Sequence, residues 1–386
     1  MIPVAQTLFK IRPGPVRASR KRYTARRALF LMPSDRMGGA ERIVRTMALE
    51  AARSGQFDRV DVFVLCWSRT GTLDELEKSG NVALYYTEAA TEWRGLPFLV
   101  RILMRHRYAL VFSSSTHINA LCSVMRRLHL LRTARLVSRE STVMFERDFG
   151  RSGKVFRAFY WLYGKQDLIV CQTTRMCASL NRHTHGRFHH LLKVIPNPID
   201  FDRIDAGRGL RLPPHIEALP ETSLKIVWCG RLSPIKSPVR AIETMRALHD
   251  MGRPQTHLFV IGDGPSRESV EAAIDQLNLQ AHVTLVGYQL NPAAVMACCD
   301  LGLMTSDIEG FPNVILEMLA AGVKGVVTTN CAGDLDTIPG VRISAEKTPA
   351  AIAEEIVALS EAAYDAKIPS FLEMRRPSSF LCKIMG

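Results

Sequence analysis

Two glutamates separated by seven residues are the side chains most suited to chemistry in this chain. Residues 309–317 read Glu-Gly-Phe-Pro-Asn-Val-Ile-Leu-Glu. Gly310 and Pro312 interrupt any helix from the N-terminal side, and the fixed φ of Pro312 suits a first helical position. Glu309 is therefore predicted on a loop and Glu317 on the helix that follows. Amides at a helix N-terminus favour an anion, and carboxylates beside them accept hydrogen bonds from sugar hydroxyls. The plainer alternative is two solvated surface carboxylates.

A second candidate site follows an apolar run at 224–229, which reads as a strand. The next residues are Gly-Arg-Leu-Ser-Pro-Ile-Lys-Ser, from Gly230 to Ser237. Gly230 lets the backbone approach a ligand closely. Arg231 offers a planar fork for phosphate oxygens, and Lys236 offers a compact cation near the next helix. Such a pair can neutralise a leaving diphosphate, although the same spacing also occurs on solvated faces.

Three glycine-bearing turns also lie between a predicted strand and a predicted helix. Gly262 belongs to the turn Gly-Asp-Gly-Pro, and Tyr288 follows Gly287 at another strand end. Gly38 and Gly39 stand in Met-Gly-Gly-Ala-Glu-Arg, before a helical pattern. Paired glycines allow backbone amides to face a phosphate or a sugar. The alternatives are tight connections without a ligand and, for Tyr288, a place in the core.

Short apolar runs alternate with helical patterns along most of the chain. The helical patterns include residues 40–53 and 119–131, and this alternation predicts parallel sheets covered by helices. The predicted strands are 28–32, 60–66, 82–85, 110–113, 135–138, 168–171 and 193–195, then 224–229, 256–261, 283–286, 301–304 and 325–328.

The alternation pauses in a polar, proline-rich stretch, which predicts a domain boundary. We therefore expect a basic N-terminal extension at 1–27, a first domain at 28–200, a linker at 201–222 and a second domain at 223–386. The predicted fold class is α/β, with two doubly wound, Rossmann-like domains facing a cleft. Ligands in such sheets bind at the carboxyl ends of the strands.

Charge is unevenly distributed along the 386 residues. Residues 1–190 carry 32 basic and 14 acidic residues, whereas the remainder carries 18 and 23. The first 34 residues contain no acidic residue, and three descriptions fit them: a disordered tail, a segment that binds anionic lipid, or a transit peptide. A nucleic-acid partner is not expected, because the aromatic content is 7% and basic residues do not alternate with aromatic ones.

These motifs together resemble the retaining glycosyltransferases of family 4, which have the GT-B architecture. The resemblance runs from about residue 28 to about residue 365. Its strongest elements are residues 230–236 and 309–317, and the Gly-Gly-Ala-Glu-Arg form at 38–42 is frequent in the family. Two departures are mild, since Ser237 and Pro198 stand where glycine is usual.

The resemblance implies roles for the candidate residues. Arg231 and Lys236 grip the donor diphosphate, Glu309 positions the donor sugar, and Glu317 binds the ribose. Gly38 and Gly39 contact the donor from the other domain. The remaining donor-binding candidates are Gly230, Gly262, Tyr288, Phe311, Pro312 and Asn313. Retention then follows a front-face path, because no protein nucleophile is evident.

The region after the strand at 135–138 departs most from the family. Many relatives have a histidine there, whereas this chain has Arg139 and Glu140. Both are candidates for acceptor recognition, with a surface ion pair as the alternative. His117, at the end of the preceding strand, is a further candidate. Asp334 and Asp336 resemble the Asp-x-Asp metal motif of GT-A transferases, but no metal or other cofactor is expected, because basic residues already serve the diphosphate.

The sequence thus predicts a glycosyltransferase, of the hexosyltransferase type, that uses a nucleotide-sugar donor. The expected acceptor is a glycan or a lipid-linked intermediate of surface polysaccharide assembly. Nine cysteines without a Cys-x-x-Cys pair fit reduced thiols, and no apolar run approaches the roughly 18–20 residues that span a bilayer. The expected location is cytoplasmic, peripheral on an anionic membrane. The alternatives are a nucleotide-sugar epimerase of the same architecture and a non-enzymatic basic binding protein.

Overall fold

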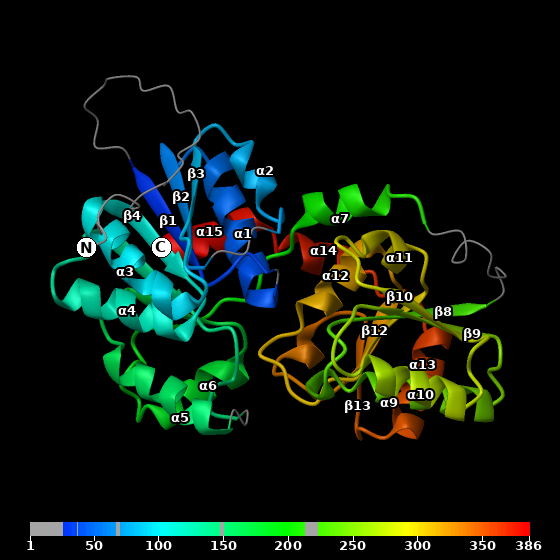
Figure 1. Cartoon of the computed structure of the whole chain (residues 1–386). Helices are drawn as coiled ribbons and strands as arrows, with labels where there is room; N and C mark the ends of the chain where they lie inside the picture. Colours follow the sequence, from blue (N-terminus) through cyan, green and yellow to red (C-terminus); the bar gives the residue numbers. More distant parts are fainter. Residues whose placement is uncertain (1–25, 37, 67–69, 147–149, 213–222) are drawn as a thin grey trace, which may run out of the picture. The chain divides into compact units, whose positions relative to one another are not determined.

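The computed structural model describes residues 26–36, 38–66, 70–146, 150–212 and 223–386. They divide into two compact units, each with its own parallel sheet (Figure 1). The first unit holds the described residues up to 172 together with 177–198 and 377–386, and the second holds 173–176 and 199–376. The predicted basic extension lies outside the described residues, apart from Arg26 and Arg27.

The first unit contains a seven-stranded sheet in the order β3-β2-β1-β4-β5-β6-β7. Its strands are β1 (Arg27–Met32), β2 (Arg59–Val64), β3 (Val82–Tyr86), β4 (Tyr108–Ser113), β5 (Thr133–Arg139), β6 (Leu168–Cys171) and β7 (Leu192–Val194). The other elements are α1 (Gly39–Arg53), α2 (Asp74–Glu77), α3 (Glu92–Arg105), α4 (Thr116–Arg127), α5 (Gly150–Ala158), η1 (Phe159–Leu162) and α15 (Pro377–Met385). Helix α6 (Thr174–His183) begins in residues of the second unit.

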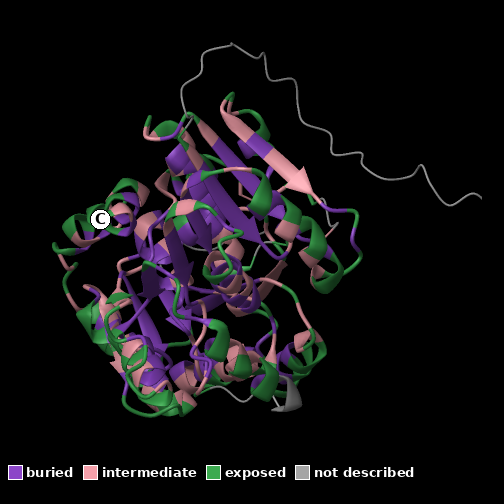
Figure 2. Cartoon of the chain, turned by 90° about the vertical axis from the view of Figure 1, so that its left-hand side faces the viewer, coloured by how far each residue is buried: buried purple, intermediate pink, exposed green. Residues whose placement is uncertain are grey.

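Strand β1 shows why these apolar runs become central strands. Phe30 and Met32 pack in one core with residues of α1 and α15, whereas Leu29 and Leu31 pack in another with residues of α3 and α4. Both faces of the strand are therefore buried, and in Figure 2 the central strands are largely in the colour of buried residues. A continuous apolar run is what a doubly covered parallel sheet requires.

The second unit contains a six-stranded sheet in the order β10-β9-β8-β11-β12-β13. Its strands are β8 (Leu224–Cys229), β9 (Thr256–Ile261), β10 (Val283–Gly287), β11 (Leu301–Met304), β12 (Gly325–Thr329) and β13 (Val341–Ser344). The helices are α7 (Phe201–Arg208), η2 (Pro234–Lys236), α9 (Pro238–Asp250), α10 (Arg267–Gln276), α11 (Ala293–Ala297), α12 (Asn313–Ala321), η3 (Leu335–Thr337), α13 (Pro349–Glu361) and α14 (Ile368–Glu373).

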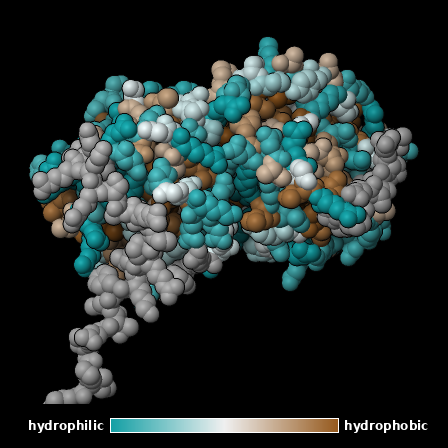
Figure 3. Space-filling model, turned by 90° about the horizontal axis from the view of Figure 1, so that it is seen from above, coloured by the Kyte–Doolittle hydropathy of each residue, from teal (hydrophilic) through white to brown (hydrophobic). Residues whose placement is uncertain are grey.

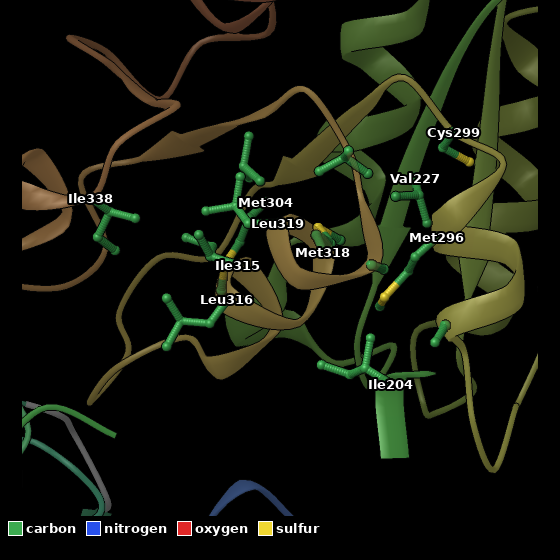
Figure 4. Packing of buried hydrophobic residues seen from close by; sticks show 14 of the residues in the cluster. Ile204, Val227, Met296, Cys299, Met304, Ile315, Leu316, Met318, Leu319 and Ile338 are labelled. Carbon is green, nitrogen blue, oxygen red and sulfur yellow. The ribbon is translucent and has the colours of Figure 1, made fainter. Parts of the chain in front are cut away.

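Helix α12 is fixed by one of the two cores that cover this sheet. Ile315, Met318 and Leu319 of α12 pack with Val227 of β8 and Met296 of α11, as Figure 4 shows. The opposite core joins the sheet to α9, α10 and α13. Burial of these apolar side chains sets the rotation of α12 and so decides which of its residues stay accessible.

In both sheets the strand order reverses next to the first strand. In the first unit the chain runs from β1 outward to β3 and returns to pair β4 with β1. In the second unit it runs from β8 outward to β10 and returns to pair β11 with β8. In doubly wound folds, ligands bind at the carboxyl ends of the strands beside such a reversal.

The fold class is confirmed: two parallel α/β sheets of the doubly wound kind. Three details differ from the expectations. Residues 377–386, predicted in the second domain, group with the first unit because Phe380, Leu381 and Ile384 are buried in its core. The predicted linker begins with a helix, α7, that packs on α11 and α12. Strand β13 was not predicted, because Val341–Ser344 is short and half exposed.

The face drawn in Figure 3 is largely hydrophilic, with small apolar areas among the polar ones. None of the described helices has the length and apolar character needed to cross a bilayer. Peripheral attachment therefore stays a prediction.

Candidate active site

The loop after β8 carries the predicted basic pair. The amide of Gly230 donates to the carbonyl of Ile261 at 3.0 Å, and that of Leu232 donates to the carbonyl of Asp263 at 3.0 Å. Leu232 is buried, whereas Arg231 beside it is exposed. No described residue forms an ion pair with Arg231, so its guanidinium stays available for an anion in this structure.

Gly262 allows the loop after β9 to pack against the loop after β8. Its φ is +137°, and a Cβ added there would lie 1.9 Å from the carbonyl oxygen of Gly230. Gly264 has a φ of +156°, and its added Cβ would lie 2.4 Å from the carbonyl oxygen of Leu232. Both positions require glycine. The structure thus explains the Gly-Asp-Gly turn by close backbone packing, and its contact with a donor stays a prediction.

Lys236 and Glu309 meet at the strand-order reversal of the second sheet. Lys236 ends η2, after β8, and Glu309 lies in the loop after β11. The Lys236 Nζ atom lies 2.5 Å from the Glu309 Oε1 atom, and the two side chains are 27% and 15% exposed. A cation and a carboxylate thus meet at the strand ends where doubly wound sheets bind ligands. Residues 73 positions apart come together there.

The segment after Glu309 is anchored by its backbone and its apolar residues. The Glu309 amide donates to the carbonyl of Cys331 at 2.8 Å, and Phe311 and Pro312 are buried. Helix α12 begins at Asn313, and Pro312 is its N-cap residue with a non-helical ψ of 89°. The prediction that Pro312 is the first helical residue is therefore wrong by one position.

The remaining donor-binding candidates differ in their exposure. Glu317 lies on α12, as predicted, and both it and Asn313 are half-buried. Tyr288 follows β10 and is 64% exposed, so the alternative of a core aromatic is wrong. Accessible side chains of this kind can accept or donate hydrogen bonds, and Tyr288 can also stack on a planar ring.

In the first unit, the glycine-rich loop already holds a carboxylate. Gly38 is the N-cap of α1 and is exposed, as is Gly39. The Oε2 atom of Glu41 would lie 2.5 Å from a Cβ added at Gly38. Burial raises the pKa of Glu41, against hydrogen bonds from its own backbone and that of Gly38. The carboxylate occupies the place of an anion at this helix N-terminus.

Arg139 is buried at the end of β5, with an exposed fraction of 1%. Its guanidinium donates to Asn197 Oδ1 at 2.6 Å and to Ser114 Oγ at 2.7 Å. Burial lowers the pKa of Arg139 to about 9, while the carboxylates of Glu140 and Glu41 act in the opposite direction. A buried cation with several hydrogen bonds organises neighbouring loops, and the alternative of a surface ion pair is wrong.

Glu140 is also buried, with an exposed fraction of 2%. The hydroxyls of Tyr160 and Tyr163 donate to its carboxylate at 2.6 and 3.0 Å. Burial raises the pKa of Glu140, against these hydrogen bonds. Neither Glu140 nor Arg139 reaches the surface of the first unit, so their predicted contact with an acceptor gains no support from their position.

His117 lies in the first turn of α4, after β4. Its Nε2 atom is 3.3 Å from the Glu92 Oε2 atom, and Trp93 packs beside its ring. Burial lowers the pKa of His117 to about 4, so the ring is neutral near pH 7 and the contact with Glu92 is no ion pair there. A neutral imidazole at a strand end can donate one hydrogen bond and accept another.

In the Asp-x-Asp sequence, Asp334 forms a structural contact. Asp334 accepts hydrogen bonds from both the amide and the hydroxyl of Thr174, at the start of α6. Within the described ranges, no group of three or more His, Cys, Asp or Glu side chains is placed to hold a metal ion. The expectation that this motif is not a metal site stays a prediction for experiment.

Sequence reasoning missed Thr305, Asp307 and Arg240, which surround the turn that carries Lys236. Arg240 donates to the carbonyl of Thr305 at 2.6 Å and lies 3.0 Å from the Asp307 carboxylate. Thr305 and Asp307 follow β11 directly, so the rule that functional residues lie at carboxyl ends of strands was the available signal.

Comparison with known proteins gives two family matches. The model described as "Glycosyltransferase Family 4" matches residues 37–203, and that described as "Glycosyl transferases group 1" matches residues 223–362. Together they cover most of the chain, with the whole second sheet and the first sheet except β1.

Curated relatives match about half of the chain. The 2-deoxystreptamine glucosyltransferase of Streptomyces kanamyceticus is 28% identical over 210 residues, which are 52% of each protein. A Campylobacter jejuni relative is 30% identical over 175 residues, or 45% of this chain and 44% of its own. Its name is N-acetylgalactosamine-N,N'-diacetylbacillosaminyl-diphospho-undecaprenol 4-alpha-N-acetylgalactosaminyltransferase. The chain thus spans about half the length of the curated relatives it matches.

Among solved structures, Anabaena Alr3699/HepE in complex with UDP and glucose has a similar fold. The TM-score is 0.73 at 18% identity, over 92% of this chain and 97% of that one. At this identity the likeness concerns the fold alone.

Proposed function

This chain belongs to the family 4 glycosyltransferases, and on that premise we propose that it transfers a sugar from a nucleotide-sugar donor to a hydroxyl acceptor. The observation that carries the proposal is the contact of Lys236 with Glu309 at the strand-order reversal of the second sheet. The exposed Arg231, on the same loop as Lys236, adds a second cation. Two cations and a carboxylate match a ligand with a diphosphate and a sugar.

Arg231 and Lys236 have the role of stabilising the leaving diphosphate. Its negative charge grows as the bond between the sugar C1 and the phosphate oxygen breaks, and fixed cations lower the energy of that transition state. The Lys236 ammonium has three N–H donors, so it can bind a phosphate oxygen of the donor while it keeps its contact with Glu309. The Glu309 carboxylate has further acceptor sites and can accept hydrogen bonds from the hydroxyls of the donor sugar at the same time.

Glu317 is proposed to accept hydrogen bonds from the donor ribose. The transfer is proposed to retain the anomeric configuration. The acceptor oxygen bonds to C1 on the face from which the diphosphate leaves, and the acceptor proton passes to the departing phosphate oxygen. The charge on the sugar ring during this exchange resembles an oxocarbenium ion, which the Glu309 carboxylate favours.

The proposed acceptor is a glycan or a lipid-linked sugar, approached at an anionic membrane from its cytoplasmic side. The Campylobacter jejuni relative is named for a diphospho-undecaprenol acceptor. In the first unit, Trp161 is 77% and Val155 is 57% exposed, in a half of the chain with strong positive charge. Exposed aromatic and basic residues together suit the interface of an anionic membrane.

Donor hydrolysis over a panel of nucleotide sugars tests the proposal. One donor should release its nucleoside diphosphate slowly without an acceptor and faster when a suitable lipid-linked or free glycan is added. An isomerised donor, formed at the same rate with and without acceptor, would instead indicate the epimerase. Binding of oligonucleotides without any turnover of nucleotide sugars would favour the non-enzymatic basic protein.

A further inference from the structure

We propose that Asp307 is a positioning residue for Lys236 and that it acts through Ser237. The inference rests on the proposed function, in which Lys236 binds the donor diphosphate. Asp307 belongs to the loop after β11, whereas Lys236 and Ser237 belong to the turn after β8. The two loops lie side by side because β8 and β11 are paired in the sheet.

Ser237 has a backbone conformation that serine rarely adopts. Its φ is +46° and its ψ is 54°, between η2 and α9. Residues with a Cβ disfavour this left-handed region, and glycine occupies it freely. The Ser237 hydroxyl donates to Asp307 Oδ2 at 2.9 Å. Its other acceptor within reach is the carbonyl of Pro234, at 3.1 Å, but the charged carboxylate is the stronger acceptor.

Asp307 is itself held through its backbone and its carboxylate. Its amide donates to the carbonyl of Ile235 at 2.9 Å. Its Oδ1 atom lies 3.0 Å from Arg240 Nη2, and its carbonyl accepts from Lys347 Nζ at 2.7 Å. A residue held at its amide, its carbonyl and both carboxylate oxygens presents its Oδ2 atom to Ser237 at a defined position.

Thr305 binds the same turn from the same loop. Its buried hydroxyl lies 3.1 Å from the Lys236 carbonyl and 2.8 Å from the Ser237 carbonyl, and it accepts from Trp228 Nε1 at 3.0 Å. Thr305 thus holds the turn at two consecutive carbonyls, those of Lys236 and Ser237. A fixed backbone limits where the Lys236 ammonium can lie, and placement of a cation decides how well it stabilises a diphosphate.

Calorimetric titration of the full chain with UDP, GDP and ADP tests this role. With the nucleoside diphosphate that binds best, Asp307→Ala should lower the affinity about tenfold. Asp307→Asn should lose less, because its amide oxygen can still accept from Ser237. Adding Ser237→Gly to Asp307→Ala should bring the affinity back to within about threefold of the unmodified chain, since glycine needs no partner in this conformation.

A double-mutant cycle with Lys236→Ala separates positioning from direct contact. In that background, Asp307→Ala should change the affinity by less than about twofold, because the cation that it positions is gone. Asn278→Ala is the matched control. Asn278 also has a positive φ, of +55°, but lies just after α10. This variant should lower the melting temperature and leave nucleotide affinity unchanged.

Normal affinity in a folded Asp307→Ala variant would overturn the inference, as would a tenfold loss that persists in the Lys236→Ala background. In either case, binding of a nucleoside diphosphate by the unmodified chain leaves the proposed function standing. Failure of the unmodified chain to bind any nucleoside diphosphate would overturn both. If Asp307→Ala does not fold, Ser237→Ala serves the same test, with the same loss expected and the same dependence on Lys236.

Discussion

At the scale of single residues, the Lys236–Glu309 contact joins two predicted roles. Each side chain was assigned to a different part of the donor, and the structure brings them to 2.5 Å from each other. The contact restrains the two side chains relative to each other. Part of the entropy cost of binding is then already met in the free protein.

Arg231→Ala and Lys236→Ala are each expected to lower kcat/KM for transfer at least 100-fold. This corresponds to about 3 kcal/mol of transition-state stabilisation, typical of a group that meets developing charge. Steady-state kinetics with the preferred donor measures it. Arg246→Ala is the control, because Arg246 is a surface residue paired with Asp250 on α9. A folded Arg231 or Lys236 variant with near-normal kcat/KM would show that the diphosphate binds elsewhere.

Glu309→Gln and Glu317→Gln are expected to differ in their kinetic effect. Glu309→Gln should lower kcat, because Glu309 is assigned to the sugar whose charge changes in the reaction. Glu317→Gln should mainly raise the donor KM, because ribose contacts are alike in the ground and transition states. Kinetics at varied donor concentration, with donor affinity measured by calorimetry, separates the two. Equal losses of kcat at unchanged donor affinity would contradict both assignments.

At the scale of elements, several residues whose types suggested catalysis instead form contacts that hold loops and short helices in place. Asp334 binds the start of α6, and Arg139 and Glu140 stabilise the buried end of β5. Buried polar groups need such partners, and an unpaired one costs roughly 1–3 kcal/mol. Their residue types are therefore explained by folding as well as by chemistry.

Treatment with EDTA is expected to leave transfer activity intact. The turn that contains η3 uses Asp334 to bind Thr174, and the proposed site supplies cations to the diphosphate itself. Activity is measured after dialysis against EDTA, with and without added Mg²⁺ or Mn²⁺, and a metal-dependent transferase treated in parallel is the control. Complete loss of activity that Mn²⁺ restores would instead support Asp334 and Asp336 as metal ligands.

Phe380→Ala is expected to destabilise the first unit by roughly 3–5 kcal/mol, the usual cost of removing a buried aromatic ring. Phe380 of α15 is 2% exposed and its ring packs against Phe112 of β4. Chemical denaturation followed by circular dichroism measures the change. Lys383→Ala, at an exposed position of the same helix, should change stability by less than about 0.5 kcal/mol. A loss below about 1 kcal/mol for Phe380→Ala would mean that α15 is not part of this core in solution.

At the scale of the whole molecule, charge is divided between the two halves of the chain. The N-terminal 190 residues are strongly basic, whereas the rest is slightly acidic. A basic half attracts anionic surfaces over about a Debye length, roughly 8 Å at physiological ionic strength. Charge of this kind is suited to bring an enzyme to a membrane without inserting it.

The chain is therefore expected to bind vesicles that contain anionic lipid, and to dissociate as salt is raised. Sedimentation with neutral and anionic vesicles, at low and high salt, measures this binding. Deletion of residues 1–27 tests the extension, and Trp161→Ala tests the apolar contribution, which salt would not weaken. Binding that ignores both lipid charge and salt would contradict the electrostatic account, and no binding at all would favour a soluble acceptor.

The order of residues by itself determined the secondary structure, the fold class and the positions of the glycine-rich turns. Secondary structure and fold class depend on local periodicity along the chain. The turns depend on single residues such as Gly262, whose backbone conformation requires glycine. The predicted strands and the observed ones accordingly agree closely, with β13 as the exception because few of its residues are buried.

Only the tertiary structure decided which distant residues meet and which polar groups are buried. Strand order brought Glu309 to Lys236 and Asp307 to Ser237, and no local pattern in the chain indicates either contact. The burial of Arg139 likewise depends on the elements packed around it. The last helix joined the first sheet for the same reason. Contacts between remote segments are selected by the packing of whole elements, and periodicity along one segment carries no information about its partner.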